Sequence, residues 1–77
     1  MSWLEGVTQA VATAANIGVG ELTLSKETSQ EILDLARIAS HESGERINAP
    51  LLCYALGIAV GKGASLEDLA AAVRAAG

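Results

Sequence analysis

The residues best suited to chemistry lie close together near the middle of the chain. His41, Arg46 and Asn48 carry side chains that can donate hydrogen bonds, and Pro50 follows two positions after Asn48. Proline favours the first turn of a helix, because an N–H there would have no helical partner. The amides at such a helix start and an arginine fork can together hold a carboxylate or a phosphate. His41, Arg46 and Asn48 are therefore candidates for an anion-binding or docking site.

The same residues are open to a second interpretation that involves no ligand. Glu42 and Glu45 lie near Arg46 in sequence, and either carboxylate could pair with the arginine. His41 falls in the last turn of an expected helix, where it could cap the carbonyl oxygens of that helix. Because His41 and Arg46 flank one connector, we expect them to lie close together beside the next helix. The sequence leaves both interpretations open.

The remaining side chains form no recognisable catalytic or metal-binding motif. The chain has one histidine, which is not close in sequence to its one cysteine, and it lacks the GxSxG, HExxH and EF-hand patterns. Cys53 lies in an apolar run and is expected to be a small core residue. The nine carboxylates are scattered, which favours a solvated surface over a cation site. We therefore expect no enzyme activity, no metal and no cofactor.

The charge balance disfavours several classes of partner. Nine acidic and five basic residues give a formal net charge of −4, and no two basic residues are closer than nine positions. Nucleic acids and anionic membranes attract clustered cations, so both are disfavoured. The N-terminus lacks the basic segment of a signal peptide. A membrane-spanning helix needs about 20 apolar residues, and the longest apolar stretch, residues 49–60, is shorter than that. We expect a soluble, cytoplasmic protein.

The elements that must position these residues are helices. Hydrophobic residues make up 51% of the 77-residue chain and aromatic residues only 3%, which is typical of an aliphatic, all-α domain. Capping serines, terminal glycines and apolar periodicity predict helices over about residues 3–16, 26–43, 51–60 and 66–76. A capping box at Thr28 is an alternative start for the second helix.

These four helices are expected to form one domain, residues 1–77, with the architecture of a small antiparallel bundle. The third helix, Leu51–Val60, is apolar on all sides, which predicts that it is central and enclosed by its neighbours. Gly57 and Gly61 would let one of those neighbours approach closely. Residues 18–24 are expected to form a loop whose Leu22 and Leu24 reach the core.

The chain also resembles a small helical bacterial family. The residues that carry the resemblance are Ala39-Ser40-His41, Arg46, Ala49-Pro50-Leu51 and Leu56–Gly61, after a helix that reads Leu33-Asp34-Leu35-Ala36-Arg37. The family is a domain of unknown function that occurs alone or attached to MobA-type molybdopterin-guanine dinucleotide synthesis proteins. The resemblance covers nearly the whole chain. It implies an accessory role near molybdenum-cofactor assembly or a cofactor-dependent oxidoreductase, and it assigns no activity.

Small size, the lack of catalytic motifs and this resemblance together favour one function. We expect a non-catalytic helical accessory protein, or a small subunit, that docks on a larger enzyme or cofactor-assembly protein. Burial against a partner would stabilise a small core that has no cross-link. The alternative is a module that binds a small anion or phosphate ligand through the connector between the second and third helices. A homo-oligomer is compatible with either function.

Overall fold

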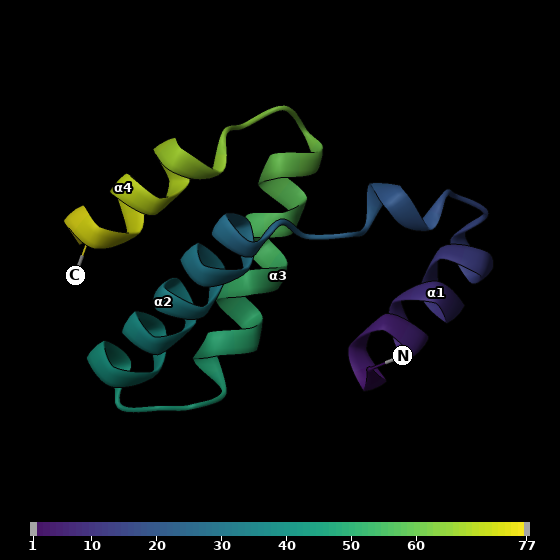
Figure 1. Ribbon diagram of the computed structural model, residues 1–77. Coiled ribbons are helices and arrows are strands. Elements are labelled where there is room, and N and C mark those ends of the chain that lie inside the picture. Colours follow the sequence, from purple (N-terminus) through teal and green to yellow (C-terminus); the bar gives the residue numbers. More distant parts are fainter. Residues whose placement is uncertain (1, 77) are drawn as a thin grey trace.

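The computed structural model describes residues 2–76 and contains four α-helices (Figure 1). They are α1 (Trp3–Ala15), α2 (Lys26–Ser43), α3 (Asn48–Gly61) and α4 (Leu66–Ala76). A short 3₁₀ helix, η1 (Val19–Glu21), lies between α1 and α2. The described residues contain no strand, so the prediction of an all-α fold with four helices is confirmed.

Serine hydroxyl groups cap the starts of α1, α2 and α4, as the sequence predicts. Ser2 Oγ accepts the amide of Glu5 at 3.1 Å, and the Glu5 carboxylate accepts the amide of Ser2 at 3.2 Å, which completes a capping box. Ser25 Oγ accepts the amide of Thr28 at 3.0 Å, so α2 begins here and the alternative start at Thr28 is wrong. Ser65 caps α4 in the same way.

The helix ends depend on residues that adopt left-handed backbone angles. Asn16 has a φ of 59° after α1, and Gly44 has a φ of 74° after α2. Glycine adopts this conformation without a steric penalty, which makes it common directly after a helix. The helix α3 begins at Asn48, three residues before the predicted start at Leu51, and no side chain caps it.

The core lies where α2, α3 and α4 meet. Leu35, Leu56 and Ala70 are buried, and each comes from a different one of these helices. Six half-buried aliphatic residues surround them: Ile32, Ile38, Leu52, Leu66, Leu69 and Val73. Their spacing on each helix matches one apolar face. Residues 26–76 are therefore a three-helix bundle with an aliphatic core.

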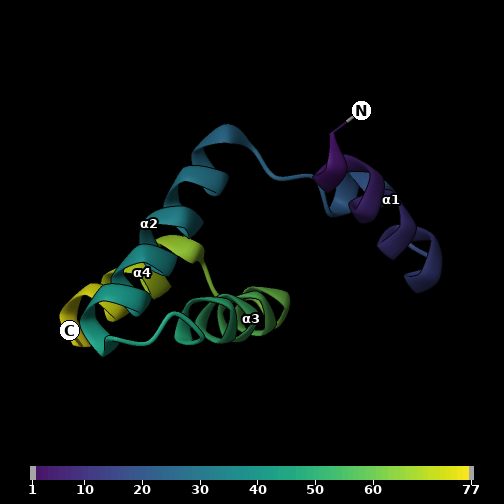
Figure 2. The ribbon, with the colours of Figure 1, turned by 90° about the horizontal axis from the view of Figure 1, so that it is seen from below.

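The helix α1 does not join this bundle. Within the described residues it packs against η1 alone, and both views show it to one side of the other helices (Figures 1 and 2). The backbone turns back after α1, where the amide of Ile17 donates to the carbonyl of Ala12 at 3.0 Å. Ala12 is buried by this turn. We call residues 3–21 the N-terminal arm. Three of the four predicted helices, α2, α3 and α4, therefore form the packed core of the domain.

The connector after the arm also differs from the prediction. Leu22 is half-buried, but Leu24 is exposed and lies outside the core cluster. The expectation that both leucines reach the core is wrong, because η1 holds this segment beside α1.

The helix α3 is not enclosed on all sides as its uniform hydrophobicity predicts. Leu56 is buried, but Leu51, Tyr54 and Ile58 are exposed. No atom lies within 4 Å of the Cβ positions that a side chain would add at Gly57 or Gly61, so no neighbouring helix approaches them closely. The reason is that α2 and α4 cover one face of α3, and the arm does not cover the other.

No described helix has both the length and the hydrophobicity to cross a bilayer.

We expect Leu35→Ala to lower the free energy of unfolding by about 2–5 kcal/mol. Leu35 is completely buried, so the smaller side chain would leave a cavity in the core. Denaturant unfolding followed by circular dichroism measures this. Leu33→Ala is the matched control, since Leu33 lies on the same helix and is 64% exposed. The control should change the free energy by less than about 0.5 kcal/mol. Equal losses in the two variants would contradict this position of the core.

Candidate functional site

The three candidate residues lie at the end of the bundle where α2 connects to α3. His41 is exposed in the last turn of α2, and Arg46 is exposed in the connector. Asn48 is half-buried as the first residue of α3. The structure therefore places all three around one turn of the chain, but with different degrees of burial.

A network of local hydrogen bonds shapes this turn. Ser43 Oγ donates to the carbonyl of Ala39 at 2.6 Å and accepts the amide of Glu45 at 3.2 Å. A serine that forms hydrogen bonds both to its own helix and to the residues that follow fixes the path of the backbone at the helix end. This role of Ser43 was not predicted, although its place directly before Gly44 is a recognisable signal.

The amides at the start of α3 are already paired. The amide of Asn48 donates to the carbonyl of Glu45 at 3.2 Å, and that of Ala49 donates to the carbonyl of Arg46 at 3.1 Å. Pro50 has no amide hydrogen. An anion at a helix start depends on free amides, and these first three positions offer none. An anion near the connector would depend on the His41 and Arg46 side chains.

The ion pairs that the sequence suggests for Arg46 also differ from the one observed. Arg46 forms no ion pair with Glu42 or Glu45 among residues 2–76, where the one ion pair joins Arg74 of α4 to Glu31 of α2 at 2.6 Å. The hydrogen bond to Glu31 raises the pKa of the Arg74 guanidinium. Both side chains are partly exposed, so this pair orients α4 on α2 more than it stabilises the fold.

A shallow, open apolar groove lies beside the connector, between the C-terminal half of α2, the start of α3 and the end of α4. It has a volume of about 480 Å³. Its apolar lining consists of Ile38, Ala39, Leu51, Leu52, Val73 and Ala76, and its polar lining of Glu42, Ser43 and Asn48. We call this the connector groove. Asn48 is thus brought to the groove, whereas His41 and Arg46 do not line it.

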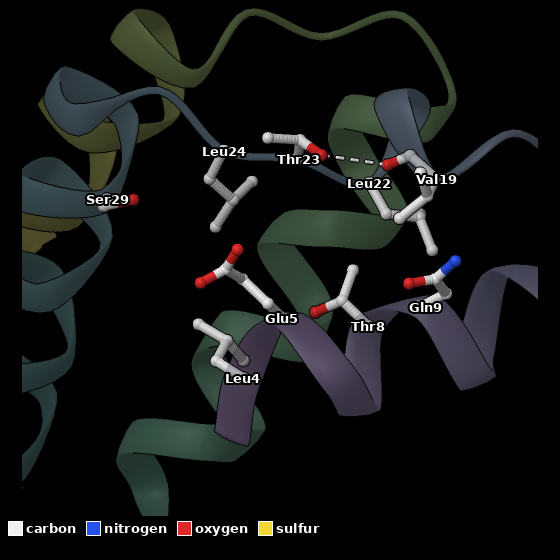
Figure 3. Close-up of a pocket in the computed structure, with 9 residues that line it drawn as sticks. All are labelled: Leu4, Glu5, Thr8, Gln9, Val19, Leu22, Thr23, Leu24 and Ser29. Carbon is white, nitrogen blue, oxygen red and sulfur yellow. Dashed lines mark hydrogen bonds between the residues drawn. The ribbon is translucent and has the colours of Figure 1, made fainter. Parts of the chain in front are cut away.

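A second hollow separates α1 from the connector that leads to α2 (Figure 3). It measures about 380 Å³, and its walls include Leu4, Thr8, Leu22 and Leu24. Thr23 Oγ1 donates to the carbonyl of Val19 at 3.0 Å across its rim, drawn as a dashed line in Figure 3. Its one carboxylate belongs to Glu5, which already caps α1. The hollow therefore holds no pair of groups for acid–base chemistry.

The described residues offer little for metal or thiol chemistry. His, Cys, Asp and Glu side chains of residues 2–76 do not gather in any group of three that could hold a metal ion. Cys53 is a half-buried free thiol on α3. The region around the connector consists of an apolar groove with a polar edge, and the exposed side chains of His41 and Arg46 lie outside its lining.

One family covers the chain from end to end. The chain belongs to the family described as "Domain of unknown function (DUF6457)", whose sequence model matches residues 1–77. No curated protein and no solved structure matches the chain. The match confirms the part of the sequence resemblance that concerns a domain of unknown function. The link to molybdenum-cofactor proteins stays a prediction.

We expect Arg46→Ala and His41→Ala each to change the free energy of unfolding by less than about 0.5 kcal/mol, because both side chains are exposed and neither forms a hydrogen bond or ion pair within residues 2–76. Thermal unfolding of the purified variants measures this. A large loss of stability in Arg46→Ala would show that the arginine has a structural partner.

Proposed function

We propose that the protein is a non-catalytic helical accessory protein that docks on a larger protein through the connector groove. The observation that carries this proposal is the apolar groove with a polar edge, at which Leu51 is 63% exposed. Stable interfaces combine an apolar centre with a polar rim, and this groove has both.

The shape and chemistry of the groove favour a helical segment of the partner. Three helices form its walls, and a groove of this kind accepts the apolar face of an amphipathic helix. Asn48 lies at the edge, where its amide could pair with a polar group of that helix. Arg46 and His41 stand exposed beside the groove and could meet acidic side chains of the partner.

The class of partner follows from the sequence resemblance alone. The resemblance implies a link to MobA-type synthesis proteins, and this favours a molybdenum-cofactor assembly protein or a molybdenum-dependent oxidoreductase as the partner. The chain would then act as a small subunit that supplies binding surface and no reacting group. The connector groove and the hollow beside α1 are each lined by a single carboxylate, Glu42 and Glu5, which is consistent with this role.

We expect a tagged chain, expressed in its native cells, to retain one large protein at a fixed stoichiometry. Leu51→Glu should lose that partner, because a charge would enter the apolar groove. Arg46→Ala should weaken binding by about 1–3 kcal/mol if the arginine forms a charged hydrogen bond across the interface. Quantitative mass spectrometry of the retained proteins measures both effects.

Leu33→Glu is the matched control, because Leu33 is as exposed as Leu51 but does not line the groove. It should retain the partner as the parent chain does. A partner that Leu51→Glu retains equally well would contradict docking in the groove. If no protein is retained and inorganic phosphate raises the melting temperature of the parent but not of Arg46→Ala, the anion-binding alternative is correct.

A further inference from the structure

The chain exposes more surface than a compact protein of its mass. Its accessible surface is 5757 Å², whereas a folded monomer of 7.8 kDa exposes about 4,400 Å². Its radius of gyration is 13.4 Å, against about 11.5 Å for a compact domain of this length. The excess of roughly 1,400 Å² reflects the arm, which stands clear of the bundle (Figures 1 and 2).

Two helix faces carry exposed apolar side chains in a regular pattern. The outer face of α1 consists of Trp3, Val7 and Val11, which recur every four residues, and Trp3 is 79% exposed. The outer face of α3 consists of Tyr54, Ala55 and Ile58, and Tyr54 is 74% exposed. Neither face shares a residue with the connector groove.

We propose that these two faces cover each other between two copies of the chain, in a two-fold dimer that exchanges its N-terminal arms. Each copy carries both faces, so a two-fold axis pairs α1 of one copy with α3 of the other twice over. Burial of the excess surface of both copies removes about 2,800 Å², which lies within the range of about 2,000–5,000 Å² for obligate homodimers.

Charge permits this pairing although the chain is acidic. The net charge is −4, yet α3 contains no charged residue and α1 contains only Glu5, whose carboxylate caps its own helix. The contact therefore brings no like charges together. Gly57 is open on α3, and no atom lies within 4 Å of the position its Cβ would take. An alanine-rich helix such as α1 can approach closely there.

The connector supports exchange of the arm as a unit. The bond from Ile17 to Ala12 holds the chain against the end of α1, and the bond from Thr23 to Val19 closes η1, which packs on α1. Only the short segment 22–25 then leads to α2, and its last residue, Ser25, is extended with a ψ of 164°. An arm that is joined to its own bundle only by this short segment can pack on a second copy without rearrangement of the bundle.

The test uses the mass of the full chain in solution and the fluorescence of Trp3, the one tryptophan. Light scattering should give twice the 7.8 kDa chain mass, and the emission of Trp3 should be that of a shielded indole. Val7→Glu and Tyr54→Glu, one on each face, should each reduce the mass to that of one chain and shift the emission to that of an exposed indole. Both side chains are exposed in the single chain, so circular dichroism should show unchanged helix content.

Leu33→Glu is the control, because it places the same charge at an exposed leucine outside both faces and should change neither readout. A parent chain with the mass of one copy overturns the proposal, and a shielded Trp3 in that case shows that the arm closes on its own bundle. A dimer that survives either Val7→Glu or Tyr54→Glu also overturns it, because the two faces then do not pair with each other. Should Tyr54→Glu lose helix content, Ile58→Lys on the same face provides the same test.

Discussion

Contact among Leu35, Leu56 and Ala70 is the interaction on which the rest of the structure depends. Leu35 has no exposed surface, and its two neighbours come from α3 and α4. Because Ala70 is small, α4 can lie close to α2, where Arg74 reaches Glu31. The connector groove lies between these same three helices, so the position of each of its walls depends on this contact.

A core of this size encloses only part of the apolar surface that the sequence provides. The helices α2 and α4 carry most of the charge and cover one face of α3, whereas α1 and α3 are almost uncharged and largely exposed. Interface centres are depleted in charged residues, so the uncharged helices are those suited to contact other chains. Docking in the connector groove and exchange of the arm involve different residues. Both would bury apolar surface that the core leaves exposed.

The candidate site could be predicted in part. The sequence located the turn between two helices, because Gly44 and Pro50 act locally. It did not predict that the first amides of α3 bond to the carbonyls of Glu45 and Arg46, because this depends on the path of the connector. Nor did it predict the groove, since residues from three separate helices must converge to form one.

For the fold, the sequence by itself determined where α1, α2 and α4 begin. Ser2, Ser25 and Ser65 cap amides only three residues away, so their effect does not depend on distant parts of the chain. Periodicity also showed which faces are apolar. Only the tertiary structure decided what covers those faces: Leu56 is buried while Tyr54 on the same helix is exposed. The physical reason is that hydrophobic burial has no fixed partner, so an apolar helix face can pack on its own chain, on a second copy or on another protein.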